Sequence, residues 1–198
     1  MLKLLALLFF TITLGMAQGA NAGPFEDGHA AYTRGDYATA LRLWSPLAAQ
    51  GYANAQNNLG LMYANGQGVP KDDKEALRLF GLAAAQGLAE AQTSLGFMYE
   101  RGQGVPQNDK EAVRLFGLAA AQGGAYAQGA LGVMYESGRG VVQNYVQAHM
   151  WYNLSAANGY PDVFKQRDEV ATKMTSAQIA QAQELAQRCQ ASSYKQCD

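Results

Sequence analysis

The sequence has few residues that could carry out chemistry. Its 198 residues include only two histidines, His29 and His149, and two cysteines, Cys189 and Cys197. The histidines are far apart, and neither has a nearby serine or cysteine in a recognisable catalytic motif. Two thiols without a nearby histidine do not supply the four ligands of a structural zinc site. We therefore expect no catalytic residues, no metal site and no cofactor.

Basic clusters and long apolar runs are also scarce. The 15 lysines and arginines are balanced by 16 acidic residues, and the formal net charge is −1. Such a balance gives no electrostatic reason to expect a nucleic acid or an anionic membrane surface as partner. The apolar run at residues 4–14 is too short for a membrane helix, which needs about 20 residues. We expect neither nucleic-acid binding nor membrane insertion.

The N-terminus has the pattern of a secretory signal peptide. Lys3 precedes the apolar run, and small residues follow it at Ala20-Asn21-Ala22. This pattern predicts a signal peptide over residues 1–22, cleaved after Ala22, with an earlier alternative after Ala17. No cysteine follows the run that could carry a lipid. The mature chain is expected to be periplasmic or secreted.

The rest of the sequence contains an internal repeat of 36 residues. Three adjoining units cover residues 51–86, 87–122 and 123–158. The first two units differ at ten positions, so 36 − 10 = 26 are identical. Residues 23–50 resemble a degenerate helix pair, and residues 159–198 contain two further helices and a tail. We interpret these two segments as caps, because the end repeats of an array must cover its open core.

Each unit predicts two helices, which we call the A helix and the B helix. Apolar residues at helical spacing predict an A helix over 53–64, which Gly66 ends. Asp72, three residues before Glu75, is typical of a capping box and predicts the start of the B helix. One helix pair has too little apolar surface to fold alone, so neighbouring pairs must stack. The predicted fold is an all-α solenoid of tandem helix pairs.

Glycines inside the A helices support this stacking. Gly60, Gly96 and Gly132 fall at the middle of the predicted A helices, where glycine costs about 1 kcal/mol relative to alanine. Close approach of a neighbouring helix would compensate for this cost. The adjacent methionines and tyrosines of each A helix, which begin with Met62 and Tyr63, are expected to pack in the core.

The motif A-x-A-Q-x-x-L-G-x-M-Y-x-x-G-x-G-V-P-x-D/N-x-x-E/Q-A, present in residues 53–76 and 89–112, resembles the Sel1-like repeat. The third unit departs from it at Val142. The resemblance implies a right-handed, tetratricopeptide-like superhelix with the A helices on its concave side. It also implies a scaffold or adaptor role. Cysteine-rich relatives suggest an alternative, a weak envelope hydrolase acting on β-lactams or peptidoglycan.

The two cysteines favour a disulfide. Cys189 and Cys197 are separated by seven residues, and an exported chain with only these two cysteines favours one intramolecular bridge. Such a bridge would hold the C-terminal tail in place.

The differences between the first two units indicate a recognition surface. Seven of the ten fall in the first fifteen residues of the unit, and most of these share one helical face. Neutral drift should change the exposed faces of both helices alike. We therefore expect a protein or peptide partner to contact the variable face of the A helices, formed by Asn54, Asn58, Leu61, Asn65, Glu90, Ser94, Phe97, Arg101, Tyr126, Ala130, Val133 and Ser137.

Overall fold

The computed structural model describes residues 23–195 and 197, and within them every regular element is a helix. The signal peptide predicted for residues 1–22 lies outside the described part. No helix in the described part is long and apolar enough to span a membrane. The elements are α1 (Pro24–Thr33), α2 (Tyr37–Ala49), α3 (Ala53–Asn65), α4 (Asp73–Ala85), α5 (Ala89–Arg101), α6 (Asp109–Ala120), α7 (Ala125–Ser137), α8 (Tyr145–Ala157), the 3₁₀ helix η1 (Pro161–Val163), α9 (Phe164–Ala171) and α10 (Ser176–Ala191).

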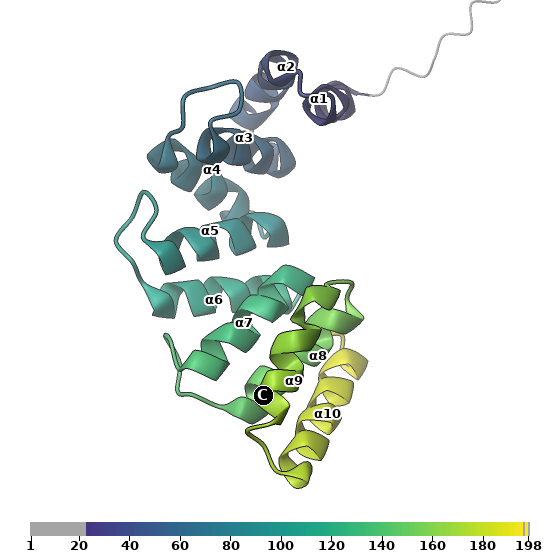
Figure 1. Cartoon of the computed structure of the whole chain (residues 1–198). Coiled ribbons are helices and arrows are strands. Elements are labelled where there is room, and N and C mark those ends of the chain that lie inside the picture. Colours follow the sequence, from purple (N-terminus) through teal and green to yellow (C-terminus); the bar gives the residue numbers. More distant parts are fainter. Residues whose placement is uncertain (1–22, 196, 198) are drawn as a thin grey trace, which may run out of the picture.

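The helices form a curved array of tandem pairs (Figure 1). The pairs α3/α4, α5/α6 and α7/α8 correspond to the three repeat units, and α1/α2 forms a fourth pair before them. Helices α9 and α10 pack against α8 and end the array. The predicted all-α array of helix pairs is confirmed.

The ends of the helices follow from local sequence. Each A helix of the three units ends at a glycine in the left-handed conformation, as at Gly102 with φ 67°. Each B helix begins after Asp72, Asn108 or Asn144, whose side chain accepts hydrogen bonds from backbone N–H groups of the first turn. The capping box is incomplete, however, because the Glu75 carboxylate pairs with Arg78.

Buried glutamines connect neighbouring pairs. In α3, Gln56 donates through Nε2 to the carbonyl of Ala48 in the preceding pair, 3.1 Å away. Its Oε1 accepts a bond from Nε2 of Gln86, at the end of its own pair, at 2.8 Å. Gln92 and Gln128 make the equivalent bonds. A buried amide is stable only when it is hydrogen-bonded, which explains the glutamine of the repeated motif.

The glycines inside the A helices lie against aromatic rings of the B helices. A Cβ atom added to Gly96 would lie 2.6 Å from Cε1 of Phe116, which is fully buried. Gly60 and Gly132 meet Phe80 and Tyr152 in the same way. The predicted close approach is confirmed. The methionines of the A helices are buried as expected, whereas the tyrosines beside them are only partly buried.

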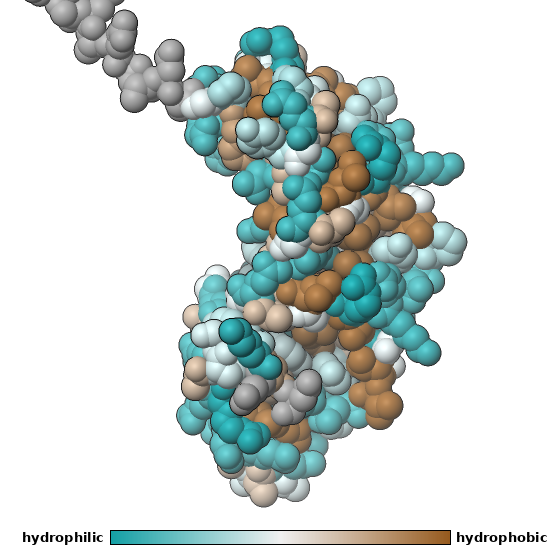
Figure 2. All heavy atoms as spheres, turned by 180° about the vertical axis from the view of Figure 1, so that it is seen from behind, coloured by the Kyte–Doolittle hydropathy of each residue, from teal (hydrophilic) through white to brown (hydrophobic). Residues whose placement is uncertain are grey.

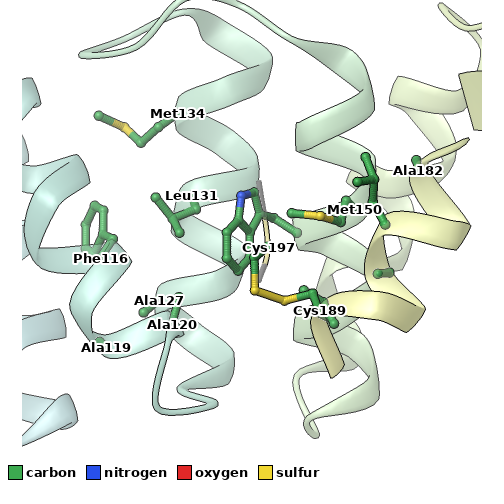
Figure 3. Packing of buried hydrophobic residues seen from close by; sticks show 14 of the residues in the cluster. Phe116, Ala119, Ala120, Ala127, Leu131, Met134, Met150, Ala182, Cys189 and Cys197 are labelled. Carbon is green, nitrogen blue, oxygen red and sulfur yellow. A yellow bond between two sulfur atoms is a disulfide. The ribbon is translucent and has the colours of Figure 1, made fainter. Parts of the chain in front are cut away.

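The C-terminal segment closes the last pair. The chain enters α9 through η1, and α10 begins with a complete capping box between Thr175 and Gln178. The disulfide between Cys189 and Cys197 is present. Both cysteines belong to a buried cluster that includes residues of α6, α7, α8 and α10, such as Phe116 and Leu131 (Figure 3). The tail is therefore part of the core of the last repeat.

Candidate partner-binding groove

A groove of about 590 Å³ lies between the A helices α3, α5 and α7. We call it the A-helix groove. It is lined by Leu61, Ala89, Glu90, Thr93, Ser94, Phe97, Gly124, Ala125 and Tyr126. Figure 2 shows that the molecule is hollowed on one side and that apolar surface extends across the middle of the face in view. The size and the apolar lining of the groove are suited to side chains of a bound peptide.

Phe97 is held in a fixed orientation in this groove. Its ring packs edge-to-face on the buried Phe116, with 5.0 Å between centroids. The guanidinium carbon of Arg101 lies over the same ring, 5.1 Å from its centroid. A ring held by two such contacts loses little conformational entropy when a partner covers it, a property of residues that contribute strongly to binding.

The rim of the groove also has polar and aromatic residues. Glu90 is exposed in the first turn of α5, and Oγ of Ser94 donates to its carbonyl at 2.9 Å. Tyr126 is 62% exposed, and its ring packs against Tyr160 with 4.4 Å between centroids. A large exposed ring supported on one face is an effective contact for a partner, because it offers apolar area and a hydroxyl group together.

A smaller hollow of about 170 Å³ continues this surface toward the N-terminus. It is lined by His29 and Tyr32 of α1, Trp44 of α2, and Asn58 and Leu61 of α3. Leu61 lines both hollows and therefore forms the ridge between them. The surface thus extends over the A helices of all four pairs.

A family model described as Sel1 repeat matches four consecutive segments, residues 21–52, 53–88, 89–124 and 125–160. The chain belongs to the Sel1 repeat family. The first of the four Sel1 repeats includes α1 and α2, the pair that the sequence analysis interprets as a degenerate cap.

Two solved Sel1-type structures are similar to this chain. One is a Sel1 repeat protein from Oxalobacter formigenes, with 34% identity, a TM-score of 0.70, and coverage of 74% of this chain and 59% of that one. The other is c5321, a protective antigen present in uropathogenic Escherichia coli strains, with 31% identity, a TM-score of 0.79, and coverage of 86% and 38%. The chain therefore matches less than two thirds of either structure's length. A comparison with curated proteins finds no match.

The Sel1 array brings some of the predicted contact residues together and separates others. Five of the twelve line the A-helix groove: Leu61, Glu90, Ser94, Phe97 and Tyr126. Asn58 lines the smaller hollow, and Arg101 is positioned by its contact with Phe97. The remaining five lie outside both linings; Asn54, Asn65, Val133 and Ser137 are exposed, and Ala130 is partly buried.

Several lining residues were missed by the sequence analysis. Ala89 and Ala125 do not belong to the variable set, because alanine recurs at this position of the repeat. Gly124 is equivalent to Tyr52 and Leu88, so its position does vary, but it precedes the A helix and was not assigned to the predicted face. Thr93 differs from its equivalent Asn57 in the first unit, but it does not belong to the predicted face. His29, Tyr32 and Trp44 lie in the degenerate first repeat, which has no aligned position in a comparison of the first two units.

The two histidines have different surroundings. His149, in α8, is buried, and its Nδ1 lies 3.1 Å from Nδ2 of Asn153. Burial and the nearby Arg167 lower its pKa, so it is neutral near pH 7. His29 is exposed in the smaller hollow. Neither histidine has a hydrogen bond to a serine in the described residues, and no group of three or more potential metal ligands occurs there.

Proposed function

We propose that this chain is an exported scaffold that binds a protein or peptide segment in the A-helix groove. The observation that carries the proposal is the groove itself. Three A helices form it, and its lining includes five residues on the face that diverged between nearly identical repeats. The conserved glycines and glutamines maintain the array, so the variable positions can change specificity without changing the fold.

The groove favours a short peptide segment over a small charged ligand. Its floor is made of Leu61, Ala89, Phe97 and Ala125, whereas Glu90 is the only charged residue in its lining. Apolar side chains of a peptide would replace water on this floor, and each buried CH₂ group contributes about 0.8 kcal/mol. The charged groups Glu90 and Arg101 lie near opposite ends of α5 and would influence orientation more than affinity.

Export is part of the same proposal. A disulfide is typical of oxidising compartments, and the Cys189–Cys197 bridge therefore supports a periplasmic or secreted location. The signal pattern of residues 1–22 supports it independently.

Site-specific photocrosslinking tests the proposed site. A photoreactive amino acid would replace Ser94 in the groove or, as a control, Val142, which is 88% exposed and lies outside the lining of the groove. We expect a discrete crosslinked product in cell-envelope extract from position 94 only. A second change, Tyr126→Ala, should abolish the product, because it removes the exposed ring from the rim.

The result that contradicts the proposal is equally specific. Equal crosslinking from positions 94 and 142, or a product at position 94 that persists with Tyr126→Ala, would show that the A-helix groove is not the binding surface. Circular dichroism of each variant would establish that the array remains folded.

A further inference from the structure

A second groove lies between the B helices α2 and α4, with α3 at its base, and encloses about 450 Å³. We call it the outer groove. It has a floor formed in part by Leu59, Tyr63 and Leu79, and Ser45 and Ala49 line its α2 side. It shares no lining residue with the A-helix groove, and the inference below is independent of the proposed function.

The same groove recurs two repeats later, where the chain's own tail fills part of it. A hollow of about 240 Å³ is lined there by residues of α6, α7 and α8 together with Tyr194, Lys195 and Cys197 of the tail. Five of its lining positions lie 72 residues, or two 36-residue repeats, after lining positions of the outer groove: Gly117 after Ser45, Ala121 after Ala49, Leu131 after Leu59, Tyr135 after Tyr63, and Trp151 after Leu79.

Tyr194 makes the most specific contacts of the tail. Its hydroxyl donates a hydrogen bond to Oδ1 of Asn158, at the end of α8, at 2.8 Å. Its ring covers Gly123, where an added Cβ would lie 3.1 Å from the ring. These contacts require a glycine turn and a side-chain amide at fixed positions in the repeat.

The backbone at the tail shows that these contacts are strong enough to offset a conformational cost. Ser193 and Tyr194 both have positive φ values, 54° and 63°, in the left-handed region that residues with a side chain rarely adopt because of its steric cost. This turn, closed by a bond from the amide of Tyr194 to the carbonyl of Cys189, directs the tail back into the groove.

The outer groove presents the same two features without a tyrosine. Gly51 occupies the position equivalent to Gly123, has a similar φ of 93°, and would place a Cβ in open space. Gln86 is equivalent to Asn158 and makes the same bond, through its Nε2, to a buried glutamine. Gln86 is exposed, and its side chain carries an amide oxygen, Oε1, which can accept a hydrogen bond as Oδ1 of Asn158 does from Tyr194.

We propose that the outer groove binds a peptide segment of another protein that presents a tyrosine side chain. The phenol ring would cover Gly51, and its hydroxyl would donate to Oε1 of Gln86. The α2 side of the outer groove has the small residues Ser45 and Ala49, as the groove filled by the tail has Gly117 and Ala121, and therefore leaves room for the backbone of such a segment.

The test uses a synthetic probe with the sequence of residues 190–198, in which alanine replaces the cysteine. It is titrated into the ¹⁵N-labelled chain of residues 23–198, whose own tail remains disulfide-bonded. We expect amide chemical shifts to change at Ser45, Ala49 and Gln86. A matched probe with alanine in place of tyrosine should bind about tenfold more weakly, because it loses the ring contact and one hydrogen bond.

Two variants of the chain separate this site from the A-helix groove. Ala49→Arg fills the outer groove from an exposed position in the last turn of α2, and it should abolish the shifts. Ser94→Arg fills the A-helix groove and should leave them unchanged. Three results would overturn the proposal. The first is equal binding of both probes, and the second is a change in amide chemical shifts confined to the A-helix groove. The third is a change in the amide shift of Ser45 when the chain is diluted without probe, which would assign the groove to a second copy of the chain.

Discussion

Replacing Gly96 with alanine tests how closely the A and B helices approach. A Cβ at this position would lie 2.6 Å from Cε1 and 2.8 Å from Cδ1 of Phe116, well inside van der Waals contact. Phe116 cannot move aside easily, because it is fully buried and packs against Phe97. The variant therefore requires either a shifted ring or a wider separation of α5 and α6.

Two opposing effects determine the size of the change. Alanine favours the helix interior by about 1 kcal/mol over glycine. Overpacking a well-packed core costs about 1–3 kcal/mol. Gly117→Ala is the matched control, since Gly117 lies within α6 beside Phe116 and an added Cβ would meet nothing within 4 Å. Both variants gain the same helix propensity from alanine, so the difference between their free energies of unfolding measures overpacking alone.

Urea unfolding followed by far-ultraviolet circular dichroism measures this difference. We expect Gly96→Ala to be about 1–3 kcal/mol less stable than Gly117→Ala. Adding Phe116→Leu to each variant should reduce the difference, because leucine lacks the ring atoms that meet the new Cβ. Equal stabilisation by the two alanines would refute the close approach and, with it, our explanation of the mid-helix glycines.

Three further predictions concern the disulfide, His149 and the cap of α4. Reducing the Cys189–Cys197 disulfide should lower the free energy of unfolding by about 2 kcal/mol, as measured by urea unfolding with and without reductant. Burial lowers the pKa of His149, so its imidazole binds a proton more weakly in the folded chain than in the unfolded chain. The free energy of unfolding should therefore fall as the pH drops below about 6.5. Thermal unfolding at several pH values should show this fall, and His149→Leu should remove the part of it that His149 causes. Asp72→Ala should cost about 1 kcal/mol by removing the cap of α4, whereas Lys71→Ala, beside the cap, should change the same unfolding midpoint little.

Much of the fold could be predicted because it depends on local signals that recur. The helix ends at Gly66 and Asp72 follow from backbone conformation and capping, which a sequence displays directly. The glycine–aromatic contacts were predictable only in part. The cost of glycine within a helix indicated a close neighbour, but identifying Phe116 as that neighbour required the stacking geometry.

The role of the buried glutamines could not be derived from one repeat. Gln56 forms bonds to Ala48 of the preceding pair and to Gln86 of its own pair, so its surroundings come from three helices. A polar residue within an apolar stripe is compatible with either exposure or a satisfied buried position, and only the packed array distinguishes them.

The candidate sites show the same division between local and long-range information. Divergence between repeats pointed to the A-helix face. The groove also includes small residues such as Ala89 and Ala125, which are identical between the units and therefore gave no signal. The outer groove gave no signal of variation at all. The outer groove was found by comparing Gly51 with Gly123. The two glycines are equivalent in the repeat and have similar φ values, but only Gly123 is covered by Tyr194. In a repeat protein, a site can therefore be found from the one copy that the chain fills itself.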